Sequence, residues 1–311
     1  MSFPPLPSAI LYLDQFVISN LSHVRNGITK SDEEFWVAVN DRLTRLLAAG
    51  QIACPVSLNH QLESSLAKSS EDIKSTAAAL SGGWSFDAFP EVCIHQLDTC
   101  FRATLTEAPL PPWRFQAPEV LARAIPFSQC SEAEIANLQN QKNKDAAEVE
   151  HLSHKVFAIK SGKSLQKWHD DEFAFLLKCY APFFVKTVPV NLRDAACHFL
   201  DGPASQSVPF LNTSAWMSAA FARKCAGGQR KSSGSILADI DSIACLSPYC
   251  DAMFVDRECH GLWSEMYNSG KITLPTRLFS HRDTTAFITF LDNLLGNQID
   301  EEERKLPTDS Q

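Results

Sequence analysis

Two short apolar runs in this chain each end on a carboxylate. Residues 10–13 lead into Asp14, and residues 252–255 lead into Asp256. Runs of this length are typical of buried strands, and a helical pattern follows each one directly, as in the strand–helix units of a parallel sheet. Such sheets place their chemistry at the carboxyl ends of the strands. We therefore expect both acids at one sheet edge, although Asp14 alone would also suit the cap of the helix that follows it.

Glu63 and Asp239 extend this pair to a set of four acids. Each lies in the early part of a predicted helix that follows a strand or a loop, so all four could meet at one edge of one sheet. Carboxylates brought that close repel one another unless divalent cations lie between them. Oxygen-only ligands favour hard ions such as Mg²⁺ or Mn²⁺, and such a site suits phosphodiester hydrolysis by metal-activated water. The predicted metal ligands and catalytic residues are Asp14, Glu63, Asp239 and Asp256.

Alternating strand and helix patterns occupy both ends of the chain and would position these acids. In the first part we expect a strand ending at Asp14, a helix over 14–25, a second helix that begins at the capping box of residues 31–34 and stops at Gly50, a strand over 51–55, and a helix from residue 57. In the second part we expect helices through Trp216 and over 235–246, a strand over 252–255, a helix over 257–267, a strand over 276–280 and a helix over 283–295. This order predicts an α/β fold with a central parallel sheet.

The middle of the chain, residues 85–204, lacks a regular alternation of strands and helices, and we expect a mainly helical insertion there. A long polar helix is predicted from the capping-box pattern at Ser131. Lys is interleaved with Glu and Asp over 142–167, which is typical of a solvated helix face or, alternatively, of an arm that embraces a partner or substrate. His151 and His154 share a helix face without a third ligand, so we interpret them as surface residues.

A basic stretch follows the helix through Trp216. Basic residues and Gly at the end of a helix are typical of an ordinary C-terminal cap. The alternative is a mobile basic loop that clamps the phosphates of a substrate, since Asp239 follows so soon. In this second interpretation the candidate substrate-binding residues are Arg223, Lys224, Arg230 and Lys231.

Two acids close to the predicted ligands are expected to lie outside the site. Asp241 cannot face the same way as Asp239, because residues two apart on a helix point in different directions, and we expect it further toward solvent. Asp251 and Asp256 lie five strand steps apart, or roughly 16 Å at about 3.3 Å per step. Asp251 is therefore expected at the opposite edge of the sheet, where it would close a turn by bonding nearby backbone N–H groups.

The composition, with 45% hydrophobic and 21% charged residues among 311, is typical of a globular protein. No apolar run is long enough to cross a bilayer and no signal peptide precedes Asp14, so we expect a cytoplasmic protein without a membrane partner. The ten cysteines contain no C-x-x-C pair, and we interpret them as reduced, mostly buried thiols. The net charge of −8 argues against broad binding to polyanions, but a metal site can invert the charge locally.

The acidic stretches resemble the motifs of PIN-like domain nucleases. Leu11-Tyr12-Leu13-Asp14 is similar to the first motif of that family, and residues 52–57 with Glu63 are similar to the second. Residues 239–244 followed by 248–256 resemble the third and fourth motifs of the larger bacterial PIN-like proteins. The resemblance covers roughly residues 8–70 and 205–297. It implies an α/β/α sandwich with a central parallel sheet, and metal-dependent ribonuclease activity.

With this resemblance the expected organisation has four parts. They are residues 1–84 and 205–299 as the two halves of a PIN-like domain, residues 85–204 as the helical insertion, and residues 300–311 as a disordered tail. The expected function is that of a metal-dependent endoribonuclease with an RNA substrate, in a toxin, defence or processing role. A homodimer or an inhibitory protein partner is left open.

The sequence also suggests two alternative functions. A catalytically silent PIN-like scaffold would bind RNA or a protein partner; the four acids argue against it, and the acidic net charge argues for it. A phosphatase of the HAD type also begins from an Asp at a strand end. That chemistry needs a second Asp two residues later, where this chain has Phe16.

Overall fold

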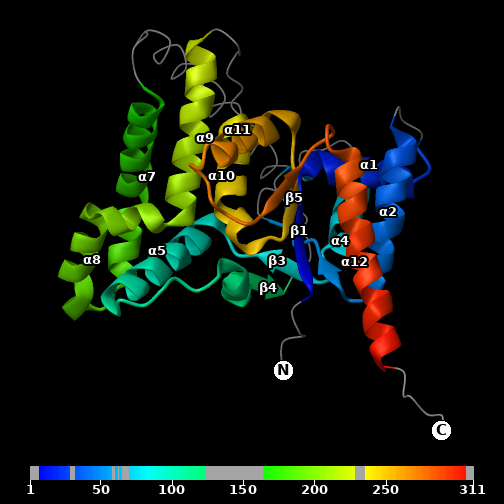
Figure 1. Ribbon diagram of the computed structural model, residues 1–311, viewed down its shortest axis with the longest axis horizontal. Helices are drawn as coiled ribbons and strands as arrows, with labels where there is room; N and C mark the ends of the chain where they lie inside the picture. The colour runs from blue at the N-terminus through cyan, green and yellow to red at the C-terminus, as the bar shows by residue number, and fades with distance from the viewer. Residues whose placement is uncertain are drawn as a thin grey trace.

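A four-stranded parallel sheet lies at the centre of the computed structural model, which describes residues 7–28, 32–57, 60–61, 63–64, 70–123, 164–227 and 235–305 (Figure 1). Its strands, in spatial order, are β2 (Ile52–Ala53), β1 (Ala9–Leu13), β5 (Ala252–Phe254) and β6 (Arg277–Phe279). The prediction of an α/β fold with a central parallel sheet is confirmed, and each of the four predicted strands is present.

Strand β1 is buried on both faces, which explains its continuous apolar sequence. Ile10 and Tyr12 face one hydrophobic cluster, whereas Leu11 and Leu13 face a second cluster on the other side. This alternation is the period of two that a strand imposes on its side chains. Helices must therefore cover both faces of the sheet.

The first face is covered by four helices, which lie to the right of the strands in Figure 1. They are α1 (Gln15–Arg25), α2 (Glu33–Ala48), α4 (Ser70–Leu80) and α12 (Thr284–Lys305). Helix α2 illustrates the packing, because its buried residues are Trp36, Val39, Leu43 and Leu46. Their spacing of three to four residues places them on one stripe that faces the core.

The second face is covered mainly by α5 (Phe89–Leu105), α9 (Pro209–Ala226), α10 (Ser235–Leu246) and α11 (Arg257–Asn268). Helix α7 (Leu165–Thr187) packs on the outer side of α9, and α8 (Arg193–Asp201) follows it (Figure 1). Helix α9 is buried over most of its length because the sheet-side helices and α7 enclose it. The helices predicted at 235–246 and 257–267 are confirmed as α10 and α11.

The segment 85–204 contains two strands that the sequence did not predict. Strands β3 (Trp84–Phe86) and β4 (Leu121–Arg123) form an antiparallel pair, joined through α5 and the 3₁₀ helix η1 (Trp113–Glu119). Neither Trp84-Ser85-Phe86 nor Leu121-Ala122-Arg123 is a continuous apolar run, which is the signal that located β1 and β5. Trp84, Phe86 and Leu121 belong to the same hydrophobic cluster as Ile10, so this part of the segment packs into the main core.

The C-terminal helix is longer than expected. Helix α12 runs to Lys305, whereas the predicted helix ended at residue 295 and the predicted disordered tail began at residue 300. The reason is that Glu, Lys and Arg, which dominate residues 301–305, are strong helix formers even without an apolar stripe. Residues 306–311 lie outside the described residues, as does most of the predicted polar helix from Ser131, with His151 and His154.

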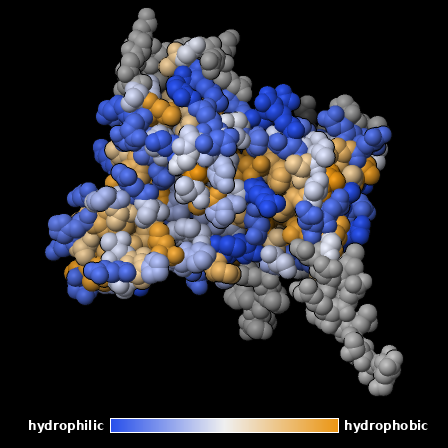
Figure 2. All heavy atoms as spheres, in the orientation of Figure 1, coloured by the Kyte–Doolittle hydropathy of each residue, from blue (hydrophilic) through white to orange (hydrophobic). Residues whose placement is uncertain are grey.

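Figure 2 shows hydrophilic and hydrophobic residues interspersed over one face, with hydrophobic residues gathered at the lower left and again to the right of the centre. A groove of about 530 Å³ lies between α7 and α8 and is lined by Leu177, Ala181 and Val185.

No helix in the described part of the chain combines the length and the apolarity that a bilayer span requires. Among the described residues all nine cysteines are free thiols; seven are buried, and Cys179 and Cys197 are exposed.

Candidate metal centre

Asp14 lies at the carboxyl edge of the sheet, between its two central strands. Its backbone N–H donates to the carbonyl oxygen of Phe254, at the end of β5, over 3.0 Å. Its carboxylate Oδ1 accepts a hydrogen bond from the N–H of Gln15 over 2.5 Å, so Asp14 is also the N-cap of α1. Asp14 therefore both follows strand β1 and caps helix α1.

Asp256 occupies the equivalent place after β5. Its Oδ1 accepts hydrogen bonds from the N–H groups of Glu258 (2.5 Å) and Cys259 (3.0 Å), which makes it the N-cap of α11. The N-termini of α1 and α11 thus lie at the sheet edge that carries the carboxylates of Asp14 and Asp256. The partial positive charge of a helix N-terminus stabilises an anion in this position.

Glu63 and Asp239 approach this edge from separate helical segments. Residues 60–61 and 63–64 are helical, and the charge of Glu63 acts directly on the carboxyl group of Asp14. Asp239 lies on α10, and one of its carboxylate oxygens, one oxygen of Asp256 and the Sγ of Cys259 lie within 4.8 Å of one another. The structure therefore brings all four predicted acids to the carboxyl edge of the sheet.

The electrostatics of this edge are strained when no cation is bound. Burial, together with the neighbouring charges of Glu63 and Asp256, raises the pKa of Asp14 to about 7, against hydrogen bonds from the N–H groups of Gln15 and Asp256. The pKa of Tyr12 also rises well above its usual value, through burial and then through the charges of Asp14 and other acids of the cluster. A divalent cation would remove this repulsion, so the donor set fits such an ion.

Cys259 is a member of the cluster that the sequence analysis did not single out. It is completely buried at the third position of α11. Burial, followed by the charges of Asp256 and Asp239, raises the pKa of its thiol. The available signal was its position three residues after Asp256, because side chains in the first turn of a helix point back toward the N-terminus.

Buried polar contacts hold the segment that carries Glu63. The Nε2 of Gln15 donates to the Oγ of Ser64 over 3.1 Å and so connects α1 to this segment. The ring of His60 stacks on Tyr12 at 4.9 Å, and its Nδ1 accepts a hydrogen bond from the N–H of Ser57 over 3.1 Å. Burial lowers the pKa of His60 to about 4, so the imidazole is neutral at pH 7.

Asp241 faces away from the metal cluster, as predicted, but the prediction that it points toward solvent is wrong. Its Oδ1 accepts a hydrogen bond from the Oγ of Ser214 on α9 over 2.7 Å, and burial raises its pKa to about 6. The sequence predicts that the side of α10 facing away from the sheet is exposed to solvent, but helix α9 packs against that side. Asp241 also raises the pKa of Glu172 on α7, second to burial, to about 7. Asp241 therefore connects α10 to α9 through Ser214 and acts electrostatically on Glu172 of α7.

Asp251 lies at the opposite edge of the sheet, as predicted, but its partners differ from the prediction. Its Oδ2 accepts hydrogen bonds from the N–H of Ile10 and from the Nε of Arg114, each over 2.7 Å. The Nη2 of Arg114 also donates to the carbonyl oxygen of Pro7 over 3.0 Å. Asp251 thus joins β1, β5 and η1. This contact places η1, and with it part of segment 85–204, near the amino edge of the sheet.

The two described residues of the predicted basic clamp are paired within the protein. Arg223 and Lys224, in the last turn of α9, both form ion pairs with Glu265 on α11, and the Lys224 Nζ to Glu265 Oε2 distance is 3.5 Å. These contacts agree with the interpretation of the basic stretch as a C-terminal helix cap, and the ion pairs also connect α9 to α11. Arg230 and Lys231 lie outside the described residues.

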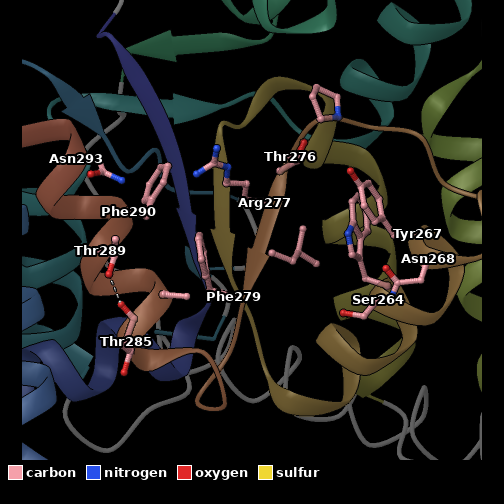
Figure 3. Close-up of a pocket in the computed structure, with 14 residues that line it drawn as sticks. Ser264, Tyr267, Asn268, Thr276, Arg277, Phe279, Thr285, Thr289, Phe290 and Asn293 are labelled. Atoms are coloured by element: carbon pink, nitrogen blue, oxygen red, sulfur yellow. Dashed lines mark hydrogen bonds between the residues drawn. The ribbon is translucent and has the colours of Figure 1, made fainter. Parts of the chain in front are cut away.

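Two grooves lie near this edge. One, of about 770 Å³, is lined by residues that include Glu33, Arg257 and His281, and it adjoins the centre because Arg257 directly follows Asp256. The other, of about 750 Å³, lies between α11 and α12 over the edge strand β6 (Figure 3). Arg277 is the single charged residue in its lining, so it lacks the carboxylates that a metal centre requires.

Comparison with known proteins finds no match among family models, curated proteins or solved structures. The resemblance to PIN-like nucleases therefore stays a prediction from the motifs. What the centre can do follows from its atoms. Clustered, partly buried carboxylates at a sheet edge can bind a divalent cation, and a bound cation can activate water and stabilise a leaving oxygen.

Proposed function

We propose that this chain is a metal-dependent endoribonuclease of PIN type, with Asp14, Glu63, Asp239 and Asp256 as the residues that hold Mg²⁺ or Mn²⁺. The observation that supports this most strongly is the approach of four acids from both halves of the chain to one sheet edge. An α/β fold with a central parallel sheet, and helices on both of its faces, is the scaffold that the motifs imply.

The chain's own residues contribute in distinct ways. Backbone N–H groups bind Oδ1 of both Asp14 and Asp256, which fixes each carboxylate at the sheet edge. Glu63 and Asp239 add carboxylates from two further helical segments and so enclose the site from the sides. A divalent cation bound there supplies a Lewis acid that lowers the pKa of water and neutralises a leaving oxygen.

The alternative is a catalytically silent PIN-like scaffold. It is favoured by the net charge of −8 and by the pairing of Arg223 and Lys224 with Glu265, since both features reduce attraction to a polyanion. The two functions differ in whether bound RNA is cleaved.

A cleavage assay on total RNA with mapped ends tests the proposal. Protein stripped with a chelator should be inactive and should cleave after addition of Mn²⁺ or Mg²⁺. Asp256→Asn should lower the rate by on the order of 100-fold or more, because loss of a metal ligand costs at least as much as loss of a residue that supports one. Asp251→Asn, at the opposite end of the same strand, is the matched control and should stay active per folded molecule.

Two results would contradict the proposal. Cleavage that survives in Asp256→Asn, or that needs no cation, would assign the chemistry elsewhere. RNA binding without cleavage, in both Mn²⁺ and Mg²⁺, would instead support the silent scaffold.

A further inference from the structure

Cys259 places a sulfur atom inside a cluster that otherwise offers oxygen. Asp256 is the N-cap of α11, and Cys259 follows at the third helical position, where its N–H also donates to Asp256. A side chain at this position points back toward the N-terminus of the helix, which here is the acidic edge of the sheet. The Sγ accordingly lies within 4.8 Å of one carboxylate oxygen of Asp239 and one of Asp256.

This spacing suits a shared cation. Three atoms that are no more than 4.8 Å apart fit on a circle with a radius of about 2.8 Å, which is 4.8 Å divided by √3. Metal bonds to carboxylate oxygen and thiolate sulfur are about 2.0–2.3 Å long. A contraction of roughly half an ångström, within the reach of small rotations about side-chain bonds, would bring all three atoms into one coordination sphere.

Other buried thiols of the chain have different surroundings. Cys93 and Cys245 face each other, with their sulfur atoms 3.8 Å apart, and Cys245 is completely buried. Free cysteines in such positions pack as small apolar groups. Cys259 differs because its sulfur lies within 4.8 Å of two carboxylate oxygens, in the first turn of a helix that begins at the acidic edge.

We propose that the Sγ of Cys259 is a ligand of the metal centre and that the centre therefore prefers Mn²⁺ and softer divalent ions over Mg²⁺. On binding, the S–H bond breaks, its electron pair forms the bond from sulfur to the cation, and the proton leaves to solvent past Asp256. Thiolate ligands favour Zn²⁺, Co²⁺ and Cd²⁺, whereas Mg²⁺ is selected by oxygen. This inference rests on the proposed metal-dependent function.

Titration with Cd²⁺ tests the proposal through the ultraviolet charge-transfer band of a cadmium–thiolate bond. The starting protein carries Ser in place of the exposed Cys179 and Cys197, and in place of Cys130, which lies outside the described residues. A band that saturates at one equivalent is expected. In Cys259→Ser the band should be lost and Cd²⁺ affinity should fall about tenfold or more, with a smaller change in Mg²⁺ affinity. Cys100→Ser, a buried thiol on α5, is the matched control and should keep the band.

A second measurement needs no substitution of Cys259. Excess Mn²⁺ should erase the cadmium band, because both ions would occupy the same centre. Mn²⁺ binding without any cadmium band, or a band that survives in Cys259→Ser, would overturn the role of Cys259 and leave the proposed function standing. Failure of both Mn²⁺ and Cd²⁺ to bind would overturn the proposed function as well.

Discussion

At the scale of single residues, the most informative feature is that Asp14 and Asp256 each end a strand and cap a helix. The sequence allowed both interpretations of Asp14, and the structure shows that they are compatible, because the residue that follows β1 at the acidic edge also accepts a hydrogen bond from the first N–H of α1. Cys259 and the buried contact of Asp241 were not predicted. Both depend on which helices lie side by side, and a single helix pattern does not contain that information.

The pair formed by Asp241 and Glu172 predicts a pH dependence of stability. The pKa of Asp241 is raised to about 6 and that of Glu172 to about 7, so the folded protein holds protons that the unfolded chain releases near pH 4. Stability from these groups is therefore present below about pH 4 and is lost as the pH rises through 6 and 7.

Asp241→Asn should relieve this loss. The amide oxygen of the variant can still accept a hydrogen bond from Ser214. We therefore expect the substitution to change the free energy of unfolding by about 1 kcal/mol more in the stabilising direction at pH 8 than at pH 4. The estimate is below the full effect of the pKa shift because Asp241 keeps partial contact with solvent. Urea unfolding at both pH values measures it, and an equal effect at pH 4 and pH 8 would contradict it.

At the scale of elements, strand order and direction explain why the acids meet. Asp14 and Asp256 follow neighbouring parallel strands paired from Leu11 with Ala252 to Leu13 with Phe254, so their positions could be predicted from strand direction alone. The short strands β3 and β4 could not be predicted, since a polar residue interrupts or ends each one and neither is a continuous apolar run like that before Asp14 or Asp256. The partners of Asp251 were missed for a related reason, because Arg114 lies 137 residues away in the sequence.

The contact of Asp251 with Ile10 and Arg114 is expected to stabilise the fold without touching the metal centre. Asp251→Asn replaces a charged acceptor of two hydrogen bonds and should lower the free energy of unfolding by about 1–2 kcal/mol. In a double-mutant cycle with Arg114→Ala, part of this loss should disappear, because both changes break the same ion pair. Chemical denaturation measures the cycle. A stable Asp251→Asn that no longer binds Mn²⁺ would contradict the assignment of the two sheet edges.

At the scale of the whole molecule, an acidic protein must bring a polyanion to an acidic edge. The net charge is −8, and the two described residues of the basic stretch are already paired with Glu265. The fold class and the order of most elements could be predicted from hydrophobic patterns. The location of η1 and β4 near the amino edge could not, because it depends on contacts between distant parts of the chain.

The basic residues should separate into two pairs with different roles. Neutralising Arg230 and Lys231 should reduce the slope of the salt dependence of RNA binding by roughly 1.4, because each of two lost phosphate contacts on a single strand contributes about 0.7. Neutralising Arg223 and Lys224 should leave the slope nearly unchanged and lower stability instead, because both side chains bind Glu265. Binding measured over a range of salt concentrations decides this. An unchanged slope in the Arg230 and Lys231 variant would exclude the clamp.

The central claim, that these acids bind a divalent cation, is tested most directly by the binding of Mn²⁺, followed through the electron paramagnetic resonance signal of the free ion. Asp239 and Asp241 provide the sharpest comparison, since they lie two residues apart on α10 and differ in whether they face the centre or α9. We predict that the native protein and Asp241→Asn bind Mn²⁺ alike, and that Asp239→Asn binds it at least about tenfold more weakly. Equal affinities in the two variants, or no binding by the native protein at millimolar Mn²⁺, would contradict the claim.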